Sequence, residues 1–434
     1  MAKQSRMLLL LAGLLVAACN RSGSQTDLSP TLTESALATA ADAVIQPTVP
    51  LNPTSSPPPA SETPQLPQPS PAVDITLAGD PFPLLPAGYE ISIQEVALVT
   101  PDFGWGLAPG EGGIYHILRT DDGGETWREI TPPQPLTPNS SWLYPSVDFY
   151  DPDTGWASYS GTDLIWSTHD GGRTWQPTRL EYTAYLGGLI HNLDKDRIWF
   201  FQFVDGGMQK VNTVLYSSQD GGHTWTKVLD PFSDAVIQGF DKTGVDFYDA
   251  QYGWLTRFFR GVTPQISLEI TSNGGSTWES LELPSPPSGI DVFSTCACGL
   301  YDPHLDSKTA GSFRLTCQCG SAENPLIKSY LYQTFDGGNS WEIVSIPEGE
   351  LLHISAGIYY VISQEIYRTE DRGENWDYIK TVNWDGQLSF ADKLTALGIA
   401  FCQEDDGSAL VKTKNGCATF QLIEPKLLPS FTVR

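Results

Sequence analysis

Four cysteines are the residues whose spacing most clearly predicts a covalent chemistry. Cys296 and Cys298 lie before the segment 299–316, and Cys317 and Cys319 lie after it. If the two Cys-x-Cys pairs sit on neighbouring antiparallel strands, one register brings Cys296 close to Cys319 and Cys298 close to Cys317. A four-thiolate zinc site is the alternative, but single-residue spacing fits a zinc knuckle poorly. We therefore expect two disulfides.

The other cysteines support export from the cytoplasm. Six cysteines remain after Cys19, and an even number in an exported chain favours disulfides. We expect Cys402 and Cys417 to form a third bridge in the last repeat, where loop closure would contribute about 3 kcal/mol.

Motifs for catalysis are absent from the chain. There is no GxSxG elbow, phosphate loop, strand-to-helix GxGxxG or HExxH. The six histidines show no ligand spacing, and acid pairs such as Asp405-Asp406 are common in a chain of net charge −26. We expect no catalytic residues, no metal ion and no cofactor. The strong negative charge also disfavours nucleic acid as a partner.

Variants of a short motif, Thr/Ser-x-Asp-x-Gly-x-Thr/Ser-Trp, occur seven times, and we name these copies the repeat turns. Their last aromatic residues are separated by 48, 50, 53, 63, 35 and 44 residues. Each interval has room for about four short strands, the size of one propeller blade. The repeat turns span Thr120–Trp127, Thr168–Trp175, Ser218–Trp225, Thr271–Trp278, Thr334–Trp341, Thr369–Trp376 and Thr413–Phe420.

Each repeat turn has a mechanical interpretation. The Asp carboxylate can accept hydrogen bonds from nearby backbone N–H groups, and the Gly can adopt positive φ. The Trp then begins the next strand and can pack between neighbouring sheets. We assign these residues structural roles: Asp122, Gly124, Trp127, Asp170, Gly172, Trp175, Asp220, Gly222, Trp225, Asn273, Gly275, Trp278, Asp336, Gly338, Trp341, Asp371, Gly373 and Trp376.

The segments between the turns complete the pattern of a blade. The motif Val-Asp-Phe-Tyr-Asp occurs at 147–151 and 245–249, and leads into Gly155-Trp156 and Gly253-Trp254. Each repeat contains four strands: an apolar strand, a Gly-Trp strand, a third strand and a Trp strand. An Asp turn joins the first two strands, and a repeat turn joins the last two. Helical periodicity is nearly absent after Ile91. The sequence predicts an all-β fold, a seven-bladed β-propeller of four-stranded antiparallel blades.

The repeat turns resemble the Asp-box of sialidase-like β-propellers, and the whole repeat is most similar to the photosystem II assembly and stability factor family. That resemblance implies a single exported or lipid-anchored propeller that binds proteins without catalysis. Sialidases use three arginines to grip a carboxylate, the first in a Phe/Tyr-Arg-Ile-Pro motif. No arginine lies between Arg21 and Arg119, and the motif is absent, so we expect no sialidase activity. A glycan-binding or glycoside-hydrolysing role is the alternative.

The N-terminus resembles a bacterial lipoprotein signal. Lys3 and Arg6 precede the apolar run 7–15, which is too short to span a bilayer, and Val-Ala-Ala-Cys ends at Cys19. Residues 1–18 are expected to be a signal peptide, and Cys19 to carry acyl chains such as palmitate. Residues 19–80 have a Pro/Ser/Thr-rich composition and are expected to form a disordered tether. The propeller is assigned to 81–434, on the extracytoplasmic side of the membrane.

Aromatic residues between the fourth strand of one blade and the first of the next are candidates for binding an envelope protein or a glycan. These candidates are Trp142, Tyr144, Tyr182, Tyr185, Phe232 and Trp384. How the ring closes stays open: the segment 81–91 adds a strand to the last blade, or the last blade is complete by itself.

Overall fold

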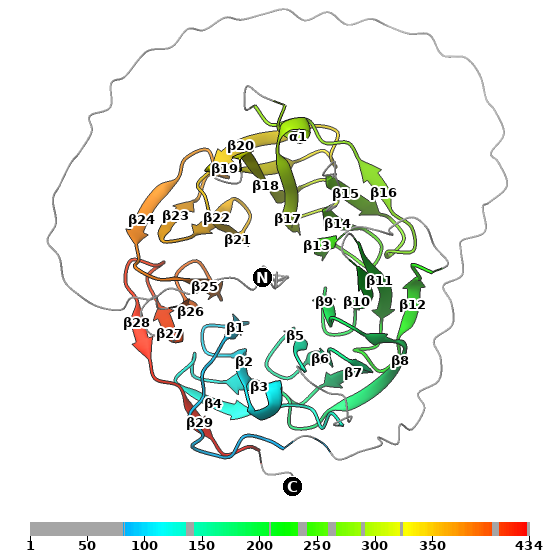
Figure 1. Ribbon diagram of the computed structural model, residues 1–434, viewed down its shortest axis with the longest axis vertical. Coiled ribbons are helices and arrows are strands. Elements are labelled where there is room, and N and C mark those ends of the chain that lie inside the picture. Colours follow the sequence, from blue (N-terminus) through cyan, green and yellow to red (C-terminus); the bar gives the residue numbers. More distant parts are fainter. Residues whose placement is uncertain are drawn as a thin grey trace, which may run out of the picture. The chain divides into compact units, whose positions relative to one another are not determined.

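A computed structural model describes residue 81 and the ranges 83–135, 143–207, 210–232, 241–258, 266–287, 291–321, 324–401 and 408–431. Seven antiparallel sheets are arranged radially around a central axis, as Figure 1 shows. The predicted seven-bladed β-propeller is therefore confirmed. Helix within the described ranges is limited to α1 (Val292–Thr295) and one 3-10 turn, Glu111–Gly113. The predicted signal peptide, tether and acylated Cys19 lie outside these ranges.

Each blade has four strands, and the chain runs from the innermost strand outward. The first four blades consist of β1 (Glu95–Leu98), β2 (Gly104–Pro109), β3 (Tyr115–Thr120) and β4 (Thr126–Glu129); β5 (Pro145–Phe149), β6 (Gly155–Tyr159), β7 (Thr162–Thr168) and β8 (Gln176–Ala184); β9 (Gly188–Asn192), β10 (Ile198–Gly207), β11 (Lys210–Ser218) and β12 (Thr226–Leu229); and β13 (Asp241–Phe247), β14 (Gly253–Phe258), β15 (Ile266–Thr271) and β16 (Glu279–Leu281). The last three consist of β17 (Ala297–Leu305), β18 (Gly311–Ser321), β19 (Asn324–Thr334) and β20 (Glu342–Ile346); β21 (Glu350–Ser355), β22 (Ile358–Ile362), β23 (Glu365–Thr369) and β24 (Asp377–Thr381); and β25 (Asp385–Phe390), β26 (Ala396–Phe401), β27 (Ser408–Thr413) and β28 (Gln421–Ile423).

The middle strands of a blade are covered on both faces by its neighbours. In β7, Leu164, Ile165 and Trp166 are all buried, without the alternation of a half-exposed strand. Side chains on both faces of the strand are therefore apolar, which explains the uninterrupted apolar run in the sequence. The core lies between the blades and is rich in Trp and Phe side chains.

The repeat turns have the geometry that the motif predicts. Asp170 accepts a hydrogen bond from the Thr174 backbone N–H at 2.9 Å, from the Thr174 hydroxyl at 2.6 Å and from the Thr168 hydroxyl at 3.0 Å. Gly172 has φ +83° and donates its N–H to the Thr168 oxygen at 2.8 Å. Both carboxylate oxygens of Asp170 are therefore used in holding the turn. Equivalent hydrogen bonds form at Asp122, Asp220, Asn273, Asp336, Asp371 and Asn415.

The repeat turns also join neighbouring blades. The indole N–H of Trp156 donates to the Gly221 carbonyl at 2.9 Å, and that of Trp199 donates to the Gly274 carbonyl at 3.0 Å. In each case the tryptophan belongs to one blade and the carbonyl to a repeat turn of the next blade. The turns therefore fix both the hairpin within a blade and the spacing between blades.

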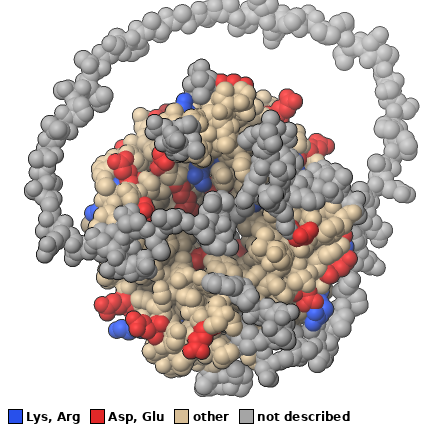
Figure 2. Space-filling view, viewed as in Figure 1, with Lys and Arg blue, Asp and Glu red and all other residues tan. Residues whose placement is uncertain are grey.

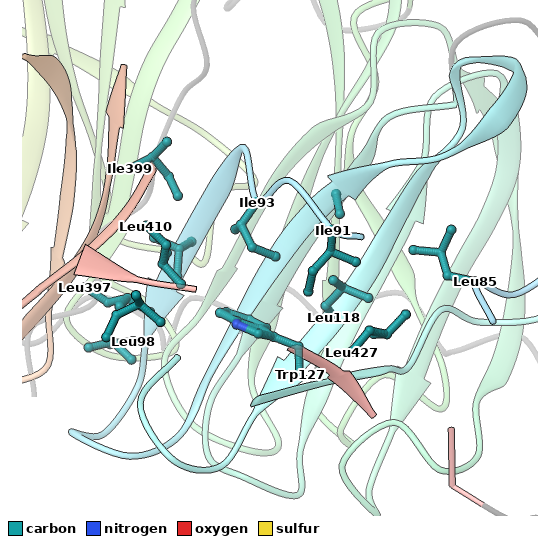
Figure 3. Close-up of a cluster of buried hydrophobic side chains, with 13 residues drawn as sticks. Leu85, Ile91, Ile93, Leu98, Leu118, Trp127, Leu397, Ile399, Leu410 and Leu427 are labelled. Carbon is teal, nitrogen blue, oxygen red and sulfur yellow. The ribbon is translucent and has the colours of Figure 1, made fainter. Parts of the chain in front are cut away.

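The ring closes through its C-terminus. The last blade is complete with its own four strands, and β29 (Lys426–Leu428) pairs in parallel with the outer strand β4 of the first blade. Ile91 and Ile93, which precede β1, pack in the same cluster as Ile399 of the last blade and Trp127 of the first (Figure 3). Of the two predicted modes, the self-contained last blade is therefore correct. The added fifth strand in the first blade was not predicted.

Two disulfides join the strands β17 and β18. Cys296 bonds to Cys319 with Cα atoms 4.4 Å apart, and Cys298 bonds to Cys317 with Cα atoms 4.0 Å apart. The predicted pairing is confirmed, and the four-thiolate zinc alternative is wrong because these sulfurs are bonded to one another.

The third predicted bridge is wrong, because Cys417 is a free, buried thiol. Cys417 lies in the last repeat turn, which follows Thr413 at one end of the blade. Cys402 lies outside the described residues, but Phe401 before it pairs with Ser408 at the opposite end of the same strands.

Candidate functional site

One repeat position lines the central channel with polar side chains. In every blade, one residue at or near the end of the innermost strand pairs with the second residue of the second strand. We name these seven residues the channel ring: Ala97, Asp148, His191, Asp246, His304, His353 and Ser389. Five consecutive members of the ring are titratable.

The channel ring surrounds a cavity of about 410 Å³. Its wall also includes the apolar side chains Leu98, Phe149 and Phe390, and the indole of Trp105. This volume is typical of a small-molecule pocket, in which a few polar groups converge within an apolar wall. The innermost strands end at one opening of the central channel, which we name the channel mouth. The repeat turns lie on the same side of the propeller, because the Gly123 N–H of a repeat turn donates to the Asp102 carbonyl after β1.

Asp246 occupies the centre of the polar arc. Its carboxylate accepts a hydrogen bond from the Leu305 N–H at 2.7 Å, which holds it against the next blade. One carboxylate oxygen lies 3.6 Å from His191 Nε2, and the other lies 3.5 Å from His304 Nδ1. His191 Nε2 accepts a hydrogen bond from the Phe247 N–H at 3.1 Å, so this nitrogen carries no proton.

Two histidines and one aspartate follow on the next two blades. The rings of His304 and His353 stack with their centroids 3.6 Å apart. Asp306, directly after β17, places Oδ1 3.5 Å from His304 Nε2 and 4.0 Å from His353 Nε2. Neither ring nitrogen of His353 has a hydrogen-bond partner among the described residues, although both are buried.

Irregularities in the inner strands aim these side chains. The register with the second strand shifts in β13, β17 and β21, which carry the ring members Asp246, His304 and His353. In the other four blades, the described residues of the first and second strands pair without such a shift. In β17 the shift contains Asp302 at φ +54°, an unusual conformation for a residue with a side chain. Bulges of this kind commonly redirect side chains at functional sites.

The environment separates the protonation behaviour of the two stacked histidines. Burial lowers the pKa of His353, and the neighbouring His304 lowers it further, to about 3. Burial also acts to lower the pKa of His304, but Asp306 and Asp246 outweigh it and leave that pKa raised. Burial raises the pKa of Asp246 to about 6. At neutral pH, His353 is therefore an uncharged imidazole with a free lone pair.

Sequence reasoning missed this cluster, because the histidines are far apart in the chain and lack a local ligand spacing. Although the histidines show no ligand spacing in the sequence, His191, His304 and His353 all lie on the channel ring. Aligning the repeats on the last residues of their first strands could have shown this. In such an alignment Asp148 and Asp246 of the two Val-Asp-Phe motifs mark the ring position directly.

The cavity differs from the pocket of a sialidase. Its described lining residues include no arginine, so a carboxylate ligand would find no guanidinium there. The Asp side chains of the repeat turns are likewise engaged in their turns, as the sequence predicted.

The predicted aromatic candidates fall into three groups. Tyr185 and Phe232 are exposed, at 63% and 58%, and Phe232 packs against Tyr182 with ring centroids 5.5 Å apart. Tyr182 is half-buried on β8 itself rather than in a connection. Leu186, beside Tyr185, is 54% exposed. We name Tyr182, Tyr185, Leu186 and Phe232 the aromatic rim.

The other candidates do not form an exposed surface. Trp384 is buried against Phe420, so its prediction as a contact residue is wrong. Tyr144 is half-buried, packs on Tyr115 and donates its hydroxyl to Glu95 at 2.5 Å. Trp142 lies outside the described residues. A loop between blades can bury a large aromatic side chain, as at Trp384, or expose it, as at Tyr185, and the sequence pattern alone does not distinguish the two.

The surface carries the acidic character of the composition. Figure 2 shows acidic side chains spread over the viewed face, with few basic side chains between them. Among the described residues, no helix combines the length and the apolar character that a transmembrane segment needs.

Comparisons with known proteins give structural likenesses. No family model matches the chain. A vacuolar protein sorting/targeting protein 10 of Schizosaccharomyces pombe is 23% identical over 209 residues, which is 44% of this chain and only 12% of that protein. The chain thus spans about an eighth of this curated relative.

Several solved structures match over most of this chain. YCF48 bound to D1 peptide has a TM-score of 0.46 at 17% identity, covering 79% of this chain and 98% of that one. An ulvan lyase, a polysaccharide lyase, has a TM-score of 0.46 at 11% identity, covering 77% of this chain and 96% of that one. The same enzyme with a bound saccharide has a TM-score of 0.46 at 12% identity. An oligogalacturonate lyase from Vibrio parahaemolyticus has a TM-score of 0.49 at 9% identity, covering 78% and 97%. These likenesses assign no activity to this chain.

Proposed function

We propose that this protein is a lipid-anchored propeller outside the cytoplasmic membrane that binds a protein partner without catalysing a reaction. The observation that carries the proposal is the aromatic rim, where Tyr185, Leu186 and Phe232 are each more than half exposed. Exposed large apolar side chains that gather at one place are typical of protein-binding surfaces. The acylated Cys19 and the tether 19–80 would hold the propeller near the membrane.

The local structure supports binding through the aromatic rim. Lys227 pairs with Asp230 at 2.8 Å and with Glu181 at 2.6 Å, and its ammonium lies 5.1 Å from the centre of the Tyr182 ring. These polar groups border the apolar side chains of Tyr182 and Phe232. An apolar centre with a polar border is the usual anatomy of a protein interface.

The absence of catalysis is consistent with how the conspicuous acidic residues are used. The Asp side chains of the repeat turns, such as Asp170, are occupied by hydrogen bonds within the turn. The repeat turns lie on the side of the propeller where the innermost strands end. Tyr185 and Leu186 of the aromatic rim follow the end of β8, on the opposite side. The proposed partner therefore binds away from the repeat turns.

A site-specific photo-crosslinker tests the proposal in intact cells. We expect the full-length protein with the crosslinker at position 185 to trap one defined protein. Position 378 is the matched control, because Tyr378 is similarly exposed, at 55%, on the outer strand of a distant blade. Phe232→Ala should weaken crosslinking from position 185. Identical products from positions 185 and 378, or none from either, would refute the aromatic rim as the binding surface.

The anchor is tested separately. Cys19→Ser should release the protein from the membrane fraction and abolish incorporation of labelled palmitate, since no acyl chain can then be attached. Membrane association that persists in this variant would contradict the anchor and leave the binding surface unaffected.

A glycan ligand is the second candidate function, and the channel cavity favours it. Its volume of about 410 Å³ accommodates one or two sugar rings, and its wall combines the aromatic side chain of Trp105 with the polar members of the channel ring. A screen of the full chain against glycans and chromogenic glycosides distinguishes this function from protein binding. Binding that is lost in Trp105→Ala and kept in Tyr185→Ala would support the glycan.

A further inference from the structure

We propose that the channel mouth contains a binding site for a divalent transition-metal ion, formed by His304, Asp306 and His353. One ligand atom from each residue lies within 4.8 Å of the other two. Two imidazoles and one carboxylate make a ligand set suited to Zn²⁺ and unlike the oxygen-only sets of Ca²⁺ or Mg²⁺.

Zinc binding requires the three ligand atoms to move closer together than they are in the structure. Nitrogen and oxygen ligands about 2.0–2.1 Å from a tetrahedral zinc ion are about 3.3 Å from one another. The Asp306 carboxylate lies 3.5 Å from His304 Nε2 and 4.0 Å from His353 Nε2. The widest possible separation of 4.8 Å must shrink by about 1.5 Å. Asp306 is partly exposed in the turn after β17 and can shorten its own two distances, whereas the stacked rings of His304 and His353, with an interplanar angle of 25°, must tilt for both nitrogens to face one ion.

His304 is already oriented as a metal-ligating histidine. Its Nε2 points toward Asp306, while its Nδ1 lies 3.5 Å from the Asp246 carboxylate. A histidine that ligates through one nitrogen commonly directs the other nitrogen to a carboxylate, which fixes the ring and increases its basicity. Asp246 is itself fixed by the Leu305 N–H at 2.7 Å. Asp246 is therefore the positioning residue of this site.

His353 supplies an independent observation. Both of its ring nitrogens are buried, and neither has a hydrogen-bond partner among the described residues. Ring nitrogens that are buried without a hydrogen-bond partner have lost their hydration without compensation, which is costly. A metal ion held with His304 and Asp306 would restore the missing interaction. The ring is also held in place by Tyr359, whose ring lies 5.1 Å away edge-on.

The remaining coordination position gives the site a chemical capacity. Three protein ligands leave a tetrahedral ion with one position for water or a small anionic ligand. Since these residues line the cavity, such a ligand would be held within the 410 Å³ space. The site thus offers the channel mouth a positive centre in a strongly acidic protein.

Calorimetric titration with ZnCl₂ tests the proposal. The full chain, without a polyhistidine tag, is treated with EDTA, freed of EDTA and titrated in detergent. We expect one zinc ion per chain with a dissociation constant in the micromolar range or below. Asp306→Asn and His353→Gln should each weaken binding at least tenfold, and Asp246→Asn should weaken it about tenfold through His304. Cobalt(II) added instead of zinc should produce a visible absorption band that Asp306→Asn removes.

Two variants serve as matched controls. His169→Ala alters the other stacked histidine pair, in which the His169 and His223 rings lie 4.8 Å apart. Asp148→Asn alters an acidic member of the channel ring, whose partner is Asn192. Both should bind zinc within twofold of the unaltered chain. Asp306 is partly exposed, so Asp306→Asn should unfold at the same temperature as the parent in the absence of zinc. Absence of saturable one-to-one binding, or equal affinity in Asp306→Asn and the parent, would overturn the proposal.

Discussion

Replacing Asp170 by alanine should destabilise the propeller through its second repeat turn. Asp170 accepts three hydrogen bonds, two from Thr174 and one from Thr168. Each contributes about 0.5–1.5 kcal/mol, so we expect the free energy of unfolding to fall by about 2–4 kcal/mol. Chemical denaturation followed by tryptophan fluorescence measures the change, since Trp175 directly follows the turn.

Asparagine at the same position is the matched control. Asn273 occupies the equivalent place in another blade, accepts from the Thr277 N–H at 2.9 Å and donates to the Thr277 hydroxyl at 2.8 Å. Asp170→Asn should therefore cost less than about 1 kcal/mol, because an amide keeps these interactions. An alanine variant as stable as the parent, or an asparagine variant as unstable as the alanine variant, would refute this account of the turn.

The charge of Asp170 gives the same turn a pH dependence. Partial burial acts to raise the pKa of Asp170, but hydrogen bonds from Thr174 and Thr168 outweigh it and hold the pKa below its usual value. A depressed folded-state pKa means that the stabilisation is complete above the unfolded value of about 3.9 and is lost as the pH falls through the folded value. Acid unfolding curves of the parent and Asp170→Asn should converge below about pH 4, because the protonated carboxyl resembles the amide.

Three further predictions follow from the packing. Gly222→Ala should lower the free energy of unfolding by about 2–4 kcal/mol in denaturant titrations, because an added Cβ would lie 2.7 Å from the Trp156 indole nitrogen at a φ of +90°. Cys417 should resist iodoacetamide until the protein is denatured, as peptide mapping would show, because burial raises the pKa of its thiol to about 12. Deletion of 426–434 should lower the thermal unfolding midpoint, since it removes Leu427 from the cluster around Trp127; an unchanged midpoint would show that β29 contributes no stability.

The fold was predictable because its determinants are local and repeated. Each turn such as Thr168–Trp175 contains within eight residues the hydroxyl, carboxylate, glycine and indole that form it. The disulfide between Cys298 and Cys317 was also predictable, because one register of adjacent strands determines the pairing. Ring closure was not, because β29 is only three residues long and pairs with a strand some 300 residues earlier without a pattern of its own.

The candidate site was predictable only in part, because it depends on relations between blades. His304 and His353 come together through the radial arrangement and through register shifts in β17 and β21, which no local spacing reveals. Exposure was equally hard to predict: Tyr185 and Trp384 occupy comparable connections, yet one is 63% and the other 7% exposed. Packing between neighbouring blades determines this difference.

The parallel pairing of β29 with β4 makes the order of synthesis significant. A ribosome completes the first blade's outer edge only when it reaches Lys426, after all the other blades have been made. Until then β4 presents an unpaired edge, and such an edge can pair with strands of other chains. A chain that ends before Lys426 would therefore have all seven four-stranded blades but would leave the β4 edge unpaired, as the outer edges of the other six blades are.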